Sequence, residues 1–168
     1  MSFEFKANTV RDDPFDDEVR SHEHDTKYGN KCREQLISYA AKMFAHQHRV
    51  FWYSVVILQN DARILRWDRS GAVFTEKFSL WANPEILGEF LWRFSHSRPV
   101  DQGYDLTATL VPEDSEYYHL MTQVAETKLA AGDYVRQYFR NSLIKEWPWW
   151  RLRIDEELAY LEMDMMQV

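Results

Sequence analysis

The chain has 168 residues, of which 45% are hydrophobic and 15% aromatic, so length and composition predict a folded domain of ordinary size rather than a disordered protein. The formal net charge of −7 argues against a general nucleic-acid binder, because such proteins carry a basic surface. A single cysteine, Cys32, excludes an internal disulfide framework and a zinc site built from several cysteines.

The sequence has no stretch with the composition of a membrane anchor or of a secretory signal. The longest apolar run, residues 50–58, is far shorter than the ~20 residues that span a bilayer. Residues 1–13 lack the apolar core of a signal peptide. We therefore expect an intracellular protein, in the cytoplasm or the nucleus, with neither a membrane nor a nucleic acid as its partner.

Acidic residues are concentrated at the N-terminus. Residues 1–26 contain eight acidic and three basic side chains, few apolar residues and no hydrophobic period. This composition predicts a mobile acidic arm over residues 1–28. A docking tail and a solvated terminus are the two roles that fit the arm, and the second is the more common one.

The first predicted helix covers residues 31–47 and has one apolar face, formed by Leu36, Ala40, Met43 and Phe44. Asn30 precedes this helix and is expected to be its N-cap. A predicted strand follows over residues 50–58. Because both of its faces are apolar, we expect a central strand that is covered from both sides.

Residues 63–69 and 72–78 form the clearest predicted hairpin. Asp68 and Gly71 stand at the first and fourth positions of the link, which suits a type I turn followed by a glycine with positive φ. Polar and apolar side chains alternate along both strands, so one face can reach the core. With the strand at residues 50–58, the hairpin predicts a three-stranded antiparallel sheet.

A second predicted helix covers residues 84–95. Asn83 is a favoured N-cap residue, and Pro84 suits the first helical position. Helical spacing places five apolar side chains in one stripe: Ile86, Leu87, Phe90, Leu91 and Phe94. Further elements are a short strand over residues 107–111, helical regions after Pro112 and from Tyr134, and a final strand within residues 147–154.

Together these elements predict an α+β fold, with an antiparallel sheet of three to five strands, flanking helices and the flexible acidic arm. The fold is expected in a single module over residues 29–155. A short tail over residues 156–168 follows it and carries no clear pattern.

The string Arg66-Trp67-Asp68-Arg69 is unusual, because three charges surround an indole at a hairpin tip. Arg66, Asp68 and Arg69 are therefore candidate interaction residues, since arginines bind acidic or phosphorylated groups through paired hydrogen bonds. The simpler interpretation is an Arg–Asp pair that fixes the turn while Trp67 packs. We favour it, because surface ion pairs commonly contribute little energy.

Three tryptophans gather near the C-terminus, around a proline. Trp149 and Trp150 are the best candidates for an interface among them, because buried aromatic side chains dominate the energy of protein contacts. Packing within the fold is the alternative role for these indoles.

Two patterns of ligating or nucleophilic side chains predict no site. His22-Glu23-His24-Asp25 lacks the further rigid ligands that would complete a zinc shell. Cys32 has no surrounding motif of a catalytic nucleophile. We therefore predict no metal, no cofactor and no catalytic residue in this chain.

Kinase chemistry needs a glycine-rich loop, a strand lysine, a catalytic-loop aspartate and a metal-binding aspartate. The sequence contains no GxGxxG, DFG or APE string, and His48-Arg49-Val50 lacks the aspartate of the HRD motif. Phosphoryl transfer by this chain is therefore not expected.

Several strings nonetheless resemble the N-terminal part of the fungal-type protein kinase domain. They are Tyr39-Ala40, Gln47-His48-Arg49, ARxxRWDRSG at residues 62–71, LxxFLWRF at residues 87–94 and G-x-D-x-T from Gly103. In that family the same strings occur in this order. The resemblance covers residues 31–110 well and residues 111–155 loosely.

The resemblance implies a non-catalytic module with a regulatory or interaction role. In that family a kinase core follows this region, and no catalytic or ATP-contacting residue of the core has a counterpart in this chain. A kinase-like core, in cis or in trans, or a second copy of the chain is therefore the expected partner. The alternative is a part of an active serine/threonine kinase, whose following core would bind ATP and Mg²⁺. Whether the product is an enzyme stays open.

Overall fold

The computed structural model of the chain describes residues 1–18, 23, 25–144 and 146–154. It divides into two compact units, an N-terminal unit over Met1–Asp105 and a C-terminal unit over Leu106–Val168. The tail predicted over residues 156–168 lies outside the described residues. That residues 29–155 act as one module stays a prediction.

A mixed sheet forms the centre of the N-terminal unit. Its strands are β1 (Ser2–Lys6), β2 (Trp52–Leu58), β3 (Asp61–Trp67), β4 (Ala72–Phe74) and β5 (Phe78–Ser79). The order is β1-β2-β3-β4, and β5 also pairs with β3. The pairs among β2, β3, β4 and β5 are antiparallel, as predicted, whereas β1 runs parallel to β2. The α+β class is confirmed.

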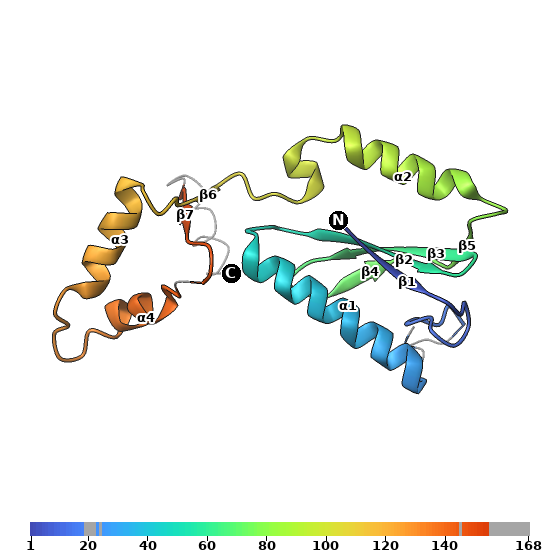
Figure 1. Ribbon diagram of the computed structural model, residues 1–168, viewed down its shortest axis with the longest axis horizontal. Helices are drawn as coiled ribbons and strands as arrows, with labels where there is room; N and C mark the ends of the chain where they lie inside the picture. Colours follow the sequence, from blue (N-terminus) through green and yellow to red (C-terminus); the bar gives the residue numbers. More distant parts are fainter. Residues whose placement is uncertain (19–22, 24, 145, 155–168) are drawn as a thin grey trace, which may run out of the picture. The chain divides into compact units, whose positions relative to one another are not determined.

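Helix α1 (Lys27–His46) covers one face of this sheet and α2 (Pro84–His96) lies over the other (Figure 1). Beneath α1 lies the hydrophobic core, which contains Cys32, Leu36, Ala40, Trp52, Val56, Leu58, Leu65 and Trp67. Adjacent side chains of a strand point to opposite faces. Val55 and Val56 are both fully buried, so β2 is covered from both sides, as its sequence predicts.

Helix α1 begins earlier than predicted. Its N-cap is Thr26, whose hydroxyl accepts a hydrogen bond from the backbone N–H of Gly29 at 3.1 Å. The prediction of Asn30 as the cap is wrong. Both threonine and asparagine are good caps, and the Asn30 side chain instead donates to Asp25, which precedes the helix, and accepts from Arg33.

Helix α2 begins at Pro84, as predicted, but its apolar stripe is only partly covered. Phe90 and Phe94 pack edge-on against Tyr53 of β2, with ring centroids 5.3 and 5.9 Å away. No residue of α2 is buried. A short 3₁₀ helix, η1 (Pro99–Gln102), follows within the same unit.

The prediction of a mobile N-terminal arm is wrong for residues 1–18. Ser2–Lys6 form β1, and Asp13 and Phe15 are buried. The alternation in β1 is the reverse of the usual one, because Ser2 and Lys6 face α1 while Phe3 and Phe5 remain exposed. A short strand with its polar side inward has no hydrophobic period that marks it as part of a fold.

The C-terminal unit contains a two-stranded antiparallel sheet and two helices. β6 (Ala108–Leu110) pairs with β7 (Trp150–Leu152), and α3 (Glu116–Glu126) and α4 (Tyr134–Ser142) lie between them in sequence. The predicted strands and helical regions of this part are confirmed, with the last strand shorter than expected.

Candidate interaction site

A buried arginine fastens the N-terminal segment to the sheet. Arg63 pairs with Val56 across β2 and β3, which places its side chain on the α1 face, where only 1% of it is exposed. Its Nε and Nη2 donate to the two carboxylate oxygens of Asp13, both at 2.9 Å. Its Nη1 and Nη2 donate to Asp17 at 2.7 and 2.9 Å. A buried charge is tolerated only with such partners.

The hydrogen bonds from Arg63 lower the pKa of Asp17 below its usual range. Lys77 adds a second cation, with its Nζ 3.2 Å from Asp13. The ring of Phe15 stacks on Phe74 of β4, with centroids 3.7 Å apart. These contacts fix the segment around residues 13–17 to the sheet. One signal in the sequence was available: a charged residue inside a buried strand requires an opposite charge.

The hairpin turn is held by its own aspartate. Asp68 Oδ1 accepts hydrogen bonds from the backbone N–H groups of Ser70 and Gly71 at 2.8 and 3.2 Å. The N–H of Asp68 donates to the carbonyl of Gly71 at 2.9 Å. Trp67 is buried and donates from Nε1 to Ser54 Oγ at 3.1 Å. Asp68 and Trp67 therefore serve the fold, as the simpler interpretation predicts.

The two arginines of the hairpin have different surroundings. Arg66 lies over the ring of Phe51 at 4.3 Å from its centroid, with Nη1 3.4 Å from Asp68 Oδ2. Arg69 is exposed, and its side chain has no interaction with any residue that the structure describes. The predicted set of Arg66, Asp68 and Arg69 thus divides into two side chains with internal partners and one that is open.

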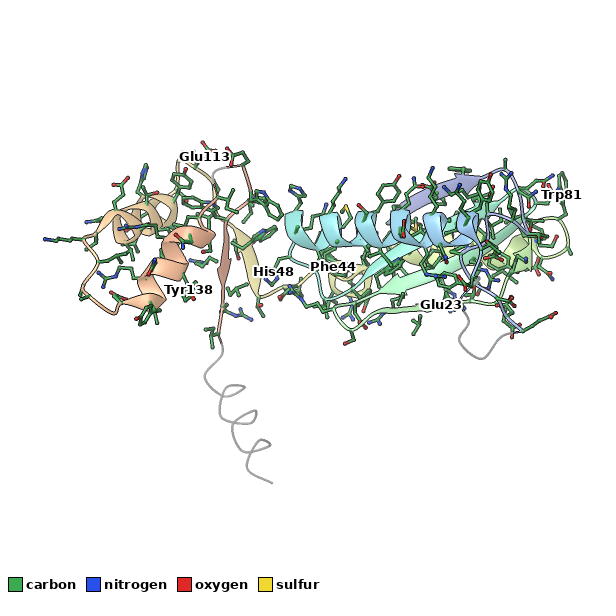
Figure 2. All side chains as sticks on the ribbon, turned by 90° about the horizontal axis from the view of Figure 1, so that it is seen from below. Glu23, Phe44, His48, Trp81, Glu113 and Tyr138 are labelled. Atoms are coloured by element: carbon green, nitrogen blue, oxygen red, sulfur yellow. The ribbon has the colours of Figure 1, made fainter. Side chains whose placement is uncertain are left out.

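Arg69 lines a cavity of about 600 Å³, which we name the α1–hairpin groove. One wall is formed by Ile37, Ala41 and Phe44 of α1, and the other by Trp67, Ala72 and Phe74 of the hairpin. Glu23 and Arg33 also line it; Figure 2 labels Glu23 and Phe44. The groove is mostly apolar, and a sequence pattern alone cannot place these separate segments together.

Two strings that carry the family resemblance meet at the beginning of β2. Arg49 is buried between the rings of Trp52 and Tyr104, at 4.7 and 3.6 Å from their centroids. Its Nη1 donates to the carbonyl of Gln102 at 2.9 Å, and its Nε donates to Gln47 Oε1 at 2.6 Å. Burial lowers the pKa of Arg49. The string Gln47-His48-Arg49 therefore has a structural role, because Arg49 joins the start of β2 to the segment at Gln102 and Tyr104.

Gly103 belongs to the same contact, because a larger residue would collide with the backbone of Phe51. A Cβ atom at Gly103 would lie 2.0 Å from the carbonyl oxygen of Phe51, and its φ of +91° is a left-handed conformation. The carbonyl of Gly103 accepts from Val50 N–H at 2.9 Å. His48 Nδ1 lies 3.0 Å from a carboxylate oxygen of Asp105, so a second pair joins the same two strings.

Trp149 and Trp150 are partly buried within the C-terminal unit. Trp149 stacks on Tyr118 of α3 with centroids 4.4 Å apart, and its Nε1 donates to the carbonyl of Ile144 at 3.1 Å. Trp150 is the first residue of β7 and pairs with Leu110. Both indoles have contacts in the fold, and their role in an interface stays a prediction.

The model of the family described as fungal protein kinase matches residues 16–137, well over half of the chain. The chain belongs to the fungal protein kinase family. Neither a curated protein nor a solved structure matches it. The resemblance predicted from the sequence strings is confirmed, and the fungal kinase match extends beyond them, from the buried N-terminal segment into α4.

The sequence of this fungal kinase family member predicts no site at Cys32 or at His22-Glu23-His24-Asp25. Burial raises the pKa of the Cys32 thiol to about 11, so it is protonated and unreactive at neutral pH. His22 and His24 lie outside the described residues. Over the part of the chain that the structure describes, no three His, Cys, Asp or Glu side chains gather closely enough to hold a metal.

None of the helices described here has the length and apolar character needed to cross a membrane.

Proposed function

We propose that this chain is a non-catalytic interaction module of the fungal protein kinase family, which regulates a kinase by contacting a kinase-like core in cis or in trans. One observation carries the proposal: three polar side chains of the family strings have their hydrogen-bond and ion-pair partners within the fold. Arg49, His48 and Asp68 hold backbone and neighbouring side chains together, whereas catalytic groups line a cleft that admits a substrate.

The chemistry of phosphoryl transfer supports the same assignment. Positioning and charge stabilisation of the transferred group require a phosphate-binding loop, a lysine, a base and metal ligands. The sequence lacks the strings that supply them. In this proposal ATP and Mg²⁺ bind to the partner core, and the module acts in the cytoplasm or the nucleus.

We propose one separate contact surface in each unit. Arg66, Asp68 and Arg69 present charge at the hairpin tip of the N-terminal unit. Trp149 and Trp150 lie in the C-terminal unit, in the same unit as the exposed Tyr134, Val135 and Tyr138 of α4. Exposed apolar side chains grouped on a surface favour association with a partner.

An assay of activity and binding tests the proposal. The purified chain should neither hydrolyse ATP nor phosphorylate protein above background, and it should bind the catalytic core of a kinase of this family in a titration calorimeter. Saturable ATP turnover that survives further purification would contradict the non-catalytic role. Absence of binding to the core, with a chain that stays monomeric at high micromolar concentration, would contradict the interaction role.

The alternative is that the chain is a part of an active fungal-type serine/threonine kinase. The family match itself favours this reading, because the family is described as protein kinases. Transcript sequence that extends past this region distinguishes the two. A downstream strand lysine and an HRD-like loop support the alternative, and their absence from the full transcript supports a separate regulatory module.

A further inference from the structure

We propose that the α1–hairpin groove binds an extended segment of a partner protein in which an apolar side chain is flanked by a carboxylate. The inference rests on the proposed interaction role and deepens it, because it names the chemistry that the N-terminal unit recognises. The observations behind this inference are the volume of the groove and the charged side chains that line it.

The walls of the groove are mostly apolar, which favours an apolar side chain as the occupant. Ile37 is 50% exposed although it sits on the groove side of α1, and Phe44 and Phe74 are only partly buried. Its volume of about 600 Å³ lies within the roughly 300–1,000 Å³ that is usual for binding pockets. An aromatic or branched aliphatic side chain in this space would remove the exposed apolar surface of both walls from water.

The charged side chains that line the groove determine which group next to the apolar side chain of the partner is favoured. Of the two acidic residues there, Glu23 pairs with Arg33 at 3.4 Å, and Asp68 accepts from two turn amides and lies beside Arg66. Arg69 also lines the groove, and among the described residues its side chain has no hydrogen bond or ion pair. A carboxylate next to the apolar anchor would therefore find a guanidinium whose donors are available.

The turn prepares Arg69 for this role. Because the Asp68 side chain accepts hydrogen bonds from the backbone N–H groups of Ser70 and Gly71, the backbone of Arg69, between Asp68 and Ser70, is held in place before a partner arrives. Only the arginine side chain has to be ordered on binding, which reduces the entropic cost of the contact. A segment with a lysine beside its anchor would face Arg69 as a like charge.

Fluorescence anisotropy with two labelled peptides tests the proposal on the full chain. Both carry one phenylalanine between small residues and differ at the next position, which is aspartate in one and lysine in the other. The wild type should bind the aspartate peptide about tenfold more tightly, as expected for a charge-assisted hydrogen bond. Arg69→Glu should reverse the preference. Equal binding of both peptides by wild type and Arg69→Glu would overturn the proposal.

A control variant and a blocking variant complete the design. Lys31→Glu makes the same charge change on α1 at a residue that does not line the groove, and it should keep the wild-type preference. Ala41→Trp fills the groove from an exposed position of α1, and it should weaken both peptides at least tenfold while circular dichroism shows the fold intact. Unchanged binding by folded Ala41→Trp would place the peptides elsewhere and overturn the proposal.

The same measurements separate this inference from the proposed function. A chain that binds the kinase core but neither peptide contradicts the groove assignment and leaves the interaction role standing. A phosphoserine peptide that binds tenfold more tightly than the aspartate peptide would replace the carboxylate by a phosphate and overturn the stated chemistry. Loss of core binding in folded Arg69→Glu would support the groove as the contact.

Discussion

The N-terminal unit has a packed core, whereas the described residues of the C-terminal unit include few buried apolar side chains. In the first, Val55, Val56, Leu58 and Leu65 are completely buried beneath or between the helices. Among the described residues of the second, Val111 and Ala125 are the only buried hydrophobic side chains. Burial of apolar surface is the main favourable contribution to folding. The first unit is therefore stabilised mainly by its own core, whereas most of the described apolar side chains of the second unit are not buried.

Helix α4 carries the most exposed of these described apolar side chains. Val135 is 83% exposed, and Tyr134 and Tyr138 on the same helix are exposed as well, with Tyr138 labelled in Figure 2. Its polar face is used within the unit, since Arg140 donates to the carbonyls of Ala125 and Thr127. In the proposed interaction role, the exposed apolar side chains of α4 form part of the contact surface.

Removal of the buried cation should have the largest effect on the N-terminal unit. Arg63→Ala leaves Asp13 and Asp17 without their main partner, and we expect a loss of roughly 3–5 kcal/mol in the free energy of unfolding. Urea denaturation measures it. The exposed pair of Arg93 with Glu89 is the control, and Arg93→Ala should cost only about 0.3–0.5 kcal/mol. Equal losses in the two variants would contradict the view of Arg63 as an anchor.

A methyl group at Gly103 should have the next largest effect. Gly103→Ala places a Cβ against the Phe51 carbonyl at a positive φ, and we expect a loss of about 2–3 kcal/mol in thermal or urea unfolding. Gly88→Ala is the matched control, because nothing lies within 4 Å of a Cβ there, within α2. It should stabilise the chain by about 0.5–1 kcal/mol. A tolerated Gly103→Ala would show that the two strings do not approach so closely.

Acid should loosen the contact between the N-terminal segment and the sheet. Arg63 lowers the pKa of Asp17 in the folded state, so Asp17 stabilises the fold above the unfolded-state pKa of about 3.9. This stabilisation is lost as the pH falls through the lower, folded-state pKa. The free energy of unfolding should therefore decrease below about pH 4, and Asp17→Asn should flatten that decrease. Identical pH profiles for wild type and Asp17→Asn would contradict the assignment.

Changes on the exposed face of α4 should have the smallest effect on stability. Val135→Ser and Tyr138→Ser remove side chains that are exposed, so unfolding should shift by no more than about 0.5 kcal/mol. Binding to a kinase core, or self-association measured by sedimentation, should weaken instead. Trp149→Ser differs, because it removes the stack on Tyr118, and circular dichroism should show a loss of structure in addition. Stable variants with unchanged association would leave α4 outside the interface.

Local chemistry made part of this structure predictable. The turn at Asp68 and Gly71 and the helix start at Pro84 depend on residues that are neighbours in sequence, and both are confirmed. The strand over residues 52–58 has apolar side chains on both faces, and its burial follows from that pattern alone. Two of the family strings, ARxxRWDRSG at residues 62–71 and LxxFLWRF at residues 87–94, also lie within the hairpin and α2.

Other features depend on partners that are distant in the chain. The contact of Arg63 with Asp13 joins residues 50 positions apart, so the acidic segment resembles a solvated arm until the sheet is assembled. β1 turns its polar side toward α1, which reverses the expected alternation. The groove also needs α1, the hairpin and Phe15 together. Arg69 was a candidate from its charge, but the cavity beside it required the fold.

Hydrogen exchange of the chain, with and without the catalytic core of a kinase of this family, tests the account most directly. Without the core, amides of β2 and β3 should exchange slowly and those of α4 quickly, as expected from their burial. Addition of the core should slow exchange in α4 and at the hairpin around Arg69 while the sheet interior stays as it was. Unchanged exchange in both regions at saturating core would contradict the claim that this chain is an interaction module.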